Sequence, residues 1–568
     1  MKSRKPDLAQ ELNDEFNELR NKRAVWEDHW QIVGDYVHGS KQEFVERHTE
    51  GERLNEDRYG NAGVFASRSL ASALIGMLWQ NNGKSIKLYP ARGIKDTAEN
   101  KAYFEAISEE MTEALDDPQA GLSTALAEYM LDQTSFGTSG IGVFDGGEDT
   151  SLRFEAWGLS QLYIAEGVNG RVNTVYRRSR WTLRRIMDTY GVENLSPKLQ
   201  KLAENRKNLV EKHYIIHCIK PRKNRNVERK GSLDMPFMSV HFEPDSNHII
   251  KESGFDEMPV NIARFTKLAY EEYGRGPGID ALSDVLELDY LRERFTVNVD
   301  KSGDPPLIVM DDGRFGGGTI DTSAGAINVI DLSNRIGNNI DPITPLQTVG
   351  ELNTTLTRIE QLKADIGQFF FLDKLLDFNN QTQMTASEAL LRDRIRSAAL
   401  GSVFSRQIAE TFDPLVTRAF NVLLKKGRLG VIRGSAEEQM ATARGEEPII
   451  IPDEIARRMA EGRNVYEIRY FTPAAQMARL QEAEALQQLT QFKLTLQQGN
   501  PDVADRFDDD EALKLAADVG GIADVLKSDE AVDDARNRRR QQVQAQQQAE
   551  VISEGASAAK DANEAGLI

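Results

Sequence analysis

Two amphipathic stretches of similar length are separated by an insert through which no helix can run. The first stretch extends from Ile279 to about Val299 and the second over 352–369, and both repeat apolar residues every three or four positions. This spacing gives an α-helix one apolar face. The insert, 303–349, is rich in Pro, Gly and Asp, which end helices. The pattern predicts a helix, a strand-rich excursion and a returning helix. The apolar positions are Leu282, Val285, Leu286, Leu291 and Phe295, then Leu352, Leu356, Ile359, Leu362, Ile366 and Phe369.

A third, longer helix is predicted to follow. Thr385 and Glu388 have the spacing of a capping box, in which two side chains satisfy backbone donors at a helix start. An apolar series then runs to 425–427, Lys-Lys-Gly, a typical helix end. Pro414 is predicted to kink this helix. A short polar loop, 377–383, precedes it.

This order of elements resembles the portal (head–tail connector) proteins of tailed bacteriophages, in particular those of short-tailed phages. Sequence motifs similar to those of the family occur at Ser67–Leu74, leading toward Trp79, and at Leu88-Tyr89-Pro90. It recurs at Tyr273-Gly274-Arg275-Gly276-Pro277 and at Thr385–Ala389. The resemblance covers about residues 10–490 in order. No single motif is diagnostic, so the likeness lies in their order and spacing.

The resemblance implies an α+β fold, mainly α, with the parts of a portal subunit. Two stem helices would bracket a clip, and a tunnel loop would precede a long kinked helix. The implied segments are a wing over 1–275, a stem helix over 276–302, a clip over 303–349, a second stem helix over 350–371, a tunnel loop over 372–385, the long kinked helix over 386–427, a wing return over 428–473, a helical crown over 474–530 and a mobile or helical tail over 531–568.

By the same resemblance, the chain is a non-enzymatic structural subunit of a dodecameric ring at one capsid vertex. The ring would pass double-stranded DNA during packaging and ejection. Its clip, with Asp311, Asp312 and Arg314, would dock first a terminase, which supplies the ATP hydrolysis, and then a tail adaptor. Major capsid and scaffolding proteins are further implied partners. The protein would be assembled in the host cytoplasm and remain in the virion.

Two groups of polar residues carry the channel hypothesis. The loop Asn379, Asn380, Gln381, Thr382 and Gln383 is uncharged. Its side chains would hydrogen-bond a passing duplex without the salt-dependent grip of Lys or Arg, although an ordinary helix–helix loop looks the same. Arg392, Arg394 and Arg396 could form subunit salt bridges or touch DNA, and the interleaved carboxylates Glu388 and Asp393 favour salt bridges.

Charge and cysteine content narrow the function further. A formal charge of −19 argues against tight non-specific binding to phosphates, which needs clustered cations. It is compatible with a wall past which DNA slides, or simply with solubility. Cys218 is the single cysteine, so no intramolecular disulfide can form. The N-terminus lacks a signal-peptide pattern, and the apolar stretch 62–79 contains Arg68, so we expect a buried helix and no membrane segment.

The rest of the chain predicts helices around a strand-rich region. Apolar positions from Leu8 to Val33 predict a long N-terminal helix, and 98–133 again looks helical. From about 141 to 270 the pattern changes to strands, with a hairpin at Asn169-Gly170. A strand over 465–470 and a helix from Thr472-Pro473 are predicted, then a helix over about 508–518 and a short one over 522–526.

Four groups of residues resemble chemical sites but match none. The segment 137–142, Gly-Thr-Ser-Gly-Ile-Gly, lacks the spacing of a nucleophile elbow or a dinucleotide loop and predicts a turn. The glycines of 312–318 lack the Gly-Lys-Ser/Thr ending of a phosphate loop. His213 and His217 would lie about 13 Å apart on a strand, too far to share a metal. Asp508–Asp510 is a helix cap. We therefore expect no catalytic residue, cofactor or metal.

Three points stay open. The cluster Arg536–Arg540 contains four arginines and is either solvated or faces nucleic acid. An internal or adaptor virion protein that forms no portal ring would share many of these features. A soluble α+β enzyme without a recognisable motif is the other alternative, and it would require a pocket with convergent carboxylates.

Overall fold

The structure is a computed structural model of the 568-residue chain. It describes residues 4–40, 42–49, 51–53, 58–80, 85–147, 149–226, 228–229, 231–311, 319–331, 343–346, 352–375, 400–443, 448–497, 507–520, 525–527 and 531–546. Two compact units are formed. The first comprises Met1–Gly76, Gly121–Phe144 and Phe154–Arg418, and the second comprises Met77–Ala120, Asp145–Arg153 and Ala419–Ile568.

An antiparallel five-stranded sheet dominates the first unit, with the strand order β4-β5-β6-β7-β8. Strands that follow one another in the chain are neighbours in the sheet throughout. Gly170 in the β4–β5 turn has φ 71°, which the predicted Asn-Gly turn requires. The strands are β4 (Leu162–Glu166), β5 (Val172–Thr182), β6 (Lys212–Pro221), β7 (Phe237–Glu243) and β8 (His248–Phe255).

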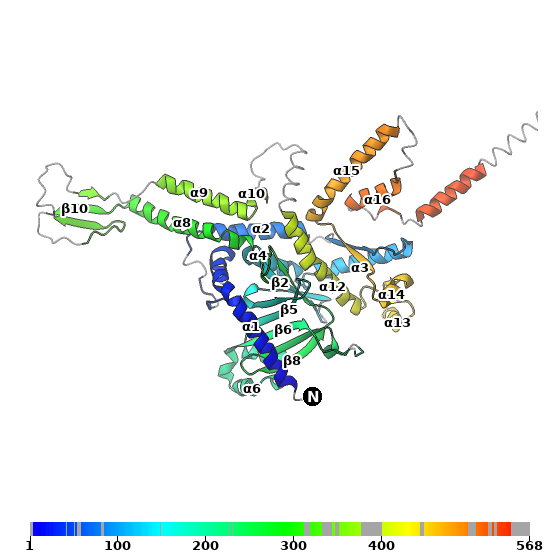
Figure 1. The fold of residues 1–568 in the computed structure, drawn as a ribbon, viewed down its shortest axis with the longest axis horizontal. Coiled ribbons are helices and arrows are strands. Elements are labelled where there is room, and N and C mark those ends of the chain that lie inside the picture. The colour runs from blue at the N-terminus through cyan, green and yellow to red at the C-terminus, as the bar shows by residue number, and fades with distance from the viewer. Residues whose placement is uncertain are drawn as a thin grey trace, which may run out of the picture. The chain divides into compact units, whose positions relative to one another are not determined.

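The predicted N-terminal helix, α1 (Arg4–Val33), lies across this sheet (Figure 1). Leu12, Phe16 and Leu19 form one core with sheet residues that include Tyr163 and Tyr176. The Phe16 ring meets the Tyr163 ring edge-on, with 4.7 Å between centroids. Cys218 is buried in the same core as a free thiol. After Val33 the helix continues as a π-turn, η1 (Gly34–His38).

Two short helices cover part of the other side of the sheet. α5 (Leu183–Tyr190) and α6 (Pro197–Ala203) contribute to a second core that contains Ile215 of β6. Beside them, His217 of β6 stacks on His241 of β7 with 3.8 Å between ring centroids. His217 Nε2 also lies 2.9 Å from Ser239 Oγ. His217 therefore packs against His241. His213 instead lies near Glu211, with 4.0 Å between His213 Nε2 and Glu211 Oε2.

The histidine pair makes this sheet sensitive to acid. Burial, helped by the positive charge of Lys251, lowers the pKa of His241 from 6.5 to about 4, and burial also lowers the pKa of His217 well below 6.5. The unfolded chain then binds more protons than the folded chain between pH 6.5 and 4, so stability falls as the pH drops through this window. We expect the free energy of unfolding to fall by about 3 kcal/mol across this window. The substitution His241→Gln should make this fall smaller. Urea unfolding of both proteins at several pH values measures this, and parallel pH profiles would contradict it.

A three-stranded sheet of order β3-β2-β9 is the second sheet of the first unit. The predicted turn at Gly137 ends α4 and starts β2 directly. The predicted helix α2 buries Leu70 and Leu74 almost fully, and no helix in the described ranges is long and apolar enough to cross a membrane. The bounds are α2 (Ala62–Leu78), α4 (Leu122–Phe136), β2 (Thr138–Asp145), β3 (Leu152–Trp157) and β9 (Val260–Arg264).

The second unit is built from helices and short strand pairs. β1 pairs with β15, which confirms the strand predicted over 465–470, and β13 pairs with β14. Asp508 accepts hydrogen bonds from two backbone N–H groups at the start of α16, as predicted for a cap. The elements are β1 (Ile86–Pro90), α3 (Ala98–Asp116), β13 (Val431–Ile432), α13 (Ala436–Ala443), β14 (Ile450–Ile451), α14 (Asp453–Ala460), β15 (Tyr466–Tyr470), α15 (Pro473–Gln497) and α16 (Asp509–Gly520).

The C-terminal helix contains the arginine cluster Arg536–Arg540, whose surroundings the sequence leaves open. Residues 531–546 are helical, and Arg536 pairs with Asp510 through two contacts of 2.6 and 2.8 Å. A carboxylate of α16 thus pairs with this arginine at the surface, and the choice between solvent and nucleic acid for the cluster stays open. Most of the short helix predicted over 522–526, and the tail beyond 546, lie outside the described residues. The predicted class, α+β and mainly α, is confirmed.

Candidate functional site

The two predicted amphipathic helices form a hairpin. α8 (Leu282–Gly303) follows the short helix α7 (Pro277–Asp280) and lies side by side with α9 (Leu352–Phe369) (Figure 1). Arg358 of α9 contacts Glu287 of α8 through two hydrogen bonds of 2.9 Å. The buried apolar residues are Leu282, Val285 and Leu288 of α8 and Ile359, Leu362 and Ile366 of α9.

Much of the apolar surface of this hairpin remains exposed within one chain. Tyr290 is 53% exposed, and Phe369 is 43% exposed. Val297, Val299 and Leu356 are exposed as well. These side chains are available for burial against another molecule.

The insert between the helices contains the predicted strands. β10 (Leu307–Asp311) lies between β11 (Ile327–Asp331), to which it is parallel, and β12 (Ile343–Pro345), to which it is antiparallel. The small sheet lies at the far end of the α8–α9 hairpin (Figure 1). Asp311 is the last residue of β10 and is paired with Asp331 in the ladder. The candidate residues Asp312 and Arg314 lie outside the described residues.

The third helix is described from residue 400 onward. It is α-helical to 407, forms a π-turn, η6 (Ile408–Phe412), and continues as α12 (Asp413–Lys425). Pro414, for which a kink is predicted, lies just after this π-turn. Proline has no N–H to donate to the preceding turn, and a wider turn is one way to accommodate that loss.

Two glycine-containing motifs meet at the base of the hairpin. Gly137 has φ 85°, and a Cβ there would lie 2.2 Å from the carbonyl carbon of Arg275 and from Gly276 N. A Cβ on Gly274 would lie 2.5 Å from Gly137 O. Gly274 N donates to Thr138 Oγ1 at 2.7 Å. The close approach of these two backbones fixes where the chain enters α7 and α8.

The segment that leads into α2 is attached to one face of α8. Asp289 of α8 accepts hydrogen bonds of 2.8 Å from both Tyr59 N and Gly60 N, just before α2. A Cβ on Gly63 would lie 3.2 Å from the methyl groups of Val285. Asp289 and Val285 are four positions apart and so share a face of α8.

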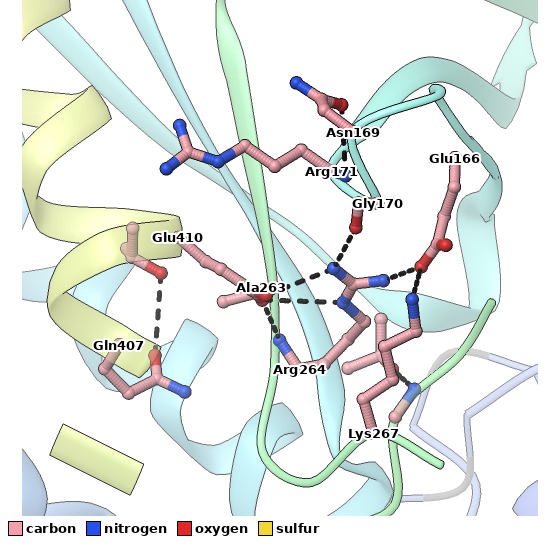
Figure 2. A network of polar contacts seen from close by, with 12 residues as sticks. Glu166, Asn169, Gly170, Arg171, Ala263, Arg264, Lys267, Gln407 and Glu410 are labelled. Atoms are coloured by element: carbon pink, nitrogen blue, oxygen red, sulfur yellow. Dashed lines mark hydrogen bonds and ion pairs between the residues drawn. The ribbon is translucent and has the colours of Figure 1, made fainter. Parts of the chain in front are cut away.

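A buried arginine connects three separate segments of the first unit. Arg264, at the end of β9, is 1% exposed and pairs with Glu166 of β4 and, at 3.1 Å, with Glu410 of the π-turn (Figure 2). It also donates to Gly170 O of the β4–β5 turn at 3.0 Å. Lys267 is a second cation on Glu166. The guanidinium therefore holds the π-turn to both sheets.

A second polar cluster holds the same π-turn from the other direction. Tyr129 of α4 is buried, and its hydroxyl donates to Gln407 Oε1 at 2.9 Å and contacts Thr411 Oγ1. Gln133, one turn further along α4, donates to Ala263 O at 2.6 Å. Burial raises the pKa of Tyr129, so the hydroxyl stays protonated. Neither polar cluster carries a sequence signal beyond isolated polar residues in apolar runs.

The predicted channel residues are not part of the described structure. Asn379, Asn380, Gln381, Thr382 and Gln383 lie outside it, as do Arg392, Arg394 and Arg396. Within the described part of the chain, no group of three or more His, Cys, Asp or Glu residues is arranged to hold a metal ion. The candidate site therefore comprises the α8–α9 hairpin, the small sheet at its far end, and the contacts at its base around Gly137, Arg264 and the π-turn.

Comparison with known sequences gives the family. The family described as bacteriophage head to tail connecting protein matches residues 9–441, more than half of the chain. The chain belongs to this family. It is 24% identical over 563 residues to a portal protein of Salmonella phage epsilon15, covering 97% of this chain and 94% of that protein. It is 25% identical over 562 residues to a probable portal protein of Bordetella phage BPP-1, covering 96% and 94%.

Solved structures add little to this assignment. A chain from the virion of a native gene transfer agent particle is 10% identical to this chain and has a TM-score of 0.29. That match covers 71% of this chain and 96% of the other chain, and a chain from the neck of an empty particle gives the same TM-score. These scores carry no argument about the fold. Family membership rests on sequence and implies a structural, connecting role.

Proposed function

We propose that the protein is a portal vertex subunit that assembles into a ring-shaped channel for double-stranded DNA. The observation that carries this proposal is the family match, extended by similarity to two phage portal proteins along nearly the whole of each chain. The exposed apolar surface of the α8–α9 hairpin supports it, since a ring buries such surface between subunits. In this proposal the protein is a component of the virion and is assembled in the host cytoplasm.

The described elements suggest how the parts of the subunit are assigned. α8 and α9 would be the stem helices, and the sheet β10–β12 would be the clip that docks the terminase and later the tail adaptor. The wing would contain the five-stranded sheet with α1, and α15 and α16 would belong to the crown. Major capsid and scaffolding proteins would surround the ring. The energy for DNA translocation would come from the terminase.

The mass and shape of the purified protein test this proposal directly. Twelve subunits of 63.6 kDa give about 763 kDa, which light scattering would report together with rings visible end-on in negative stain. A stable monomer or dimer over a range of salt concentrations would overturn the proposal and revive an adaptor protein or an enzyme. Large assemblies without a central opening would favour an internal virion protein.

The polar loop Asn379–Gln383 is proposed to support DNA in the channel. Its amide groups can hydrogen-bond a duplex without releasing many counterions, so the contact would be weak and reversible. Replacing the five residues by Gly and Ser should leave the ring intact and reduce the DNA retained per filled capsid several-fold. Ring images and the packaged genome length measure the two effects. Unchanged DNA retention with intact rings would remove the loop from the mechanism.

A further inference from the structure

The helix α2 carries a groove with basic and apolar lining. The groove has a volume of about 810 Å³ and lies in the first unit. Phe65 within it is 63% exposed, and no carboxylate lines it. Arg68, one turn from Phe65, has no ion-pair partner among the described residues. We call this surface the α2 groove; its lining includes Arg58, Val64, Phe65, Arg68 and Ser72.

A second groove in the same unit has the opposite charge. It lies between α7, α8 and α9, has a volume of about 580 Å³ and is lined by three aspartates and no cation. We call it the α9 groove. Its aspartates are Asp280, Asp284 and Asp365, and its aromatic residues are Phe265, Phe369 and Phe371.

The aspartates of the α9 groove are only partly balanced by cations: Arg275 acts on Asp280, and Arg358 acts on Asp284 and Asp365, without a direct ion pair. None of the three forms a salt bridge within the described residues. Burial, together with the neighbouring Asp365 and Glu287, raises the pKa of Asp284. Burial also raises the pKa of Asp280. Grouped carboxylates next to a partly exposed phenylalanine favour a partner that brings a cation and an apolar side chain together.

The elements that carry the two grooves are attached to different faces of α8. The start of α2 and the segment before it contact Val285 and Asp289 of α8. α9 contacts Glu287 of α8, which lies about 160° from Val285 around the helix axis. Asp284 lies about 100° from Val285, toward the α9 side. One subunit can therefore present its α2 groove to one neighbour and its α9 groove to another. A heterologous contact that closes a ring needs this arrangement.

We propose that the α2 groove of one subunit docks into the α9 groove of a second copy of the chain. Arg68 then meets Asp284 and Asp365, and Phe65 packs against Phe369. This inference rests on the proposed ring and names the surfaces that close it. Charge complementarity and an exposed phenylalanine on each surface select another copy of the chain as the occupant.

Charge reversal tests this pairing. Arg68→Glu places a carboxylate against the aspartates, and Asp365→Arg places a guanidinium against Arg68. We expect each variant alone to lower the fraction of protein in rings at least tenfold at low salt. Arg225→Glu and Asp245→Arg, exposed positions outside both grooves, serve as matched controls and should assemble like the wild type. Far-UV circular dichroism of each variant checks folding.

A one-to-one mixture of the two variants gives the decisive result. In an alternating ring, the carboxylate introduced by Arg68→Glu in one subunit meets the guanidinium introduced by Asp365→Arg in the next. The remaining contact is then the wild-type pair of Arg68 and Asp365. We expect the mixture to recover at least half of the wild-type ring fraction. Single variants that assemble normally, or folded single variants that the mixture does not rescue, would overturn the proposed pairing. Failure of the wild type to form rings would instead reject the proposed function.

Discussion

Replacing Arg264 by Ala is expected to destabilise the first unit by about 3–5 kcal/mol. The substitution removes both hydrogen bonds from the guanidinium to Glu410, which then has no cation among the described residues, while Glu166 keeps only Lys267. Breaking a buried ion pair by removing one partner costs this much, and here Glu410, 17% exposed, loses its cation and keeps only the backbone N–H of residue 264. Lysine at this position keeps the charge but cannot reach both carboxylates and Gly170 O at once. We expect Arg264→Lys to lie between Ala and the wild type.

Urea unfolding at a fixed protein concentration measures this effect, since assembly makes stability depend on concentration. Arg171→Ala is the matched control. Arg171 lies in the same turn (Figure 2), but it is exposed, and its contacts there come from its backbone: its N donates to Asn169 Oδ1, and its O accepts from Gly167 N. Loss of its side chain should change stability by less than about 0.5 kcal/mol. An Arg264→Ala protein as stable as the Arg171→Ala protein would show that the network does not hold the π-turn.

The importance of Arg264 could not be predicted from the sequence. It follows the run Val260–Ala263, where an arginine normally marks the exposed end of a strand. Its partners Glu166 and Glu410 are 98 and 146 positions away. Only the packing of β9 between another strand and the π-turn brings them together. Long-range charge pairs have no local period, so pattern analysis cannot detect them.

Local patterns, in contrast, predicted the elements of the hairpin well. The apolar spacing in 279–299 and 352–369 gave α8 and α9 within a few residues, because amphipathic periodicity is a local property. Asn169-Gly170 likewise identified the β4–β5 turn, whose positive φ few residues adopt. A π-turn, η6, precedes Pro414, where a kink is predicted; the kink itself stays a prediction. Glu410 and Thr411, which make the long-range contacts of this π-turn, carry no local sequence signal for it.

The segment around Gly137 shows both the strength and the limit of sequence analysis. Mismatched spacing argued against catalytic and nucleotide-binding motifs and predicted the turn that the structure has. The resemblance separately highlighted Tyr273–Pro277. Nothing in the sequence indicated that these two segments touch, since a glycine can mark a turn, a close approach or both. The structure requires both at Gly137, which has a positive φ and a neighbouring backbone where a side chain would be.

Replacing Gly137 by Ala is therefore expected to lower the free energy of unfolding by about 2–5 kcal/mol. Its φ of 85° is strained for alanine, which contributes about 1–2 kcal/mol. The added Cβ would also lie 2.2 Å from backbone atoms of Arg275 and Gly276, so the chain entering α7 has to move. Backbone cannot rotate away as a side chain does, and overpacking adds about 1–3 kcal/mol. The measurement is the urea midpoint, together with the ring fraction.

Gly51→Ala separates the two causes. Gly51 has the same φ of 85°, but nothing lies within 4 Å of its missing Cβ. In this variant only backbone strain is introduced, so the free energy of unfolding should fall by about 1–2 kcal/mol. The protein should still assemble. A larger loss at Gly137 than at Gly51 then measures the close approach itself. Equal losses at the two positions would mean that the segment 274–276 yields easily, and that the entry into α7 and α8 is set by Arg264 and Asp289 instead.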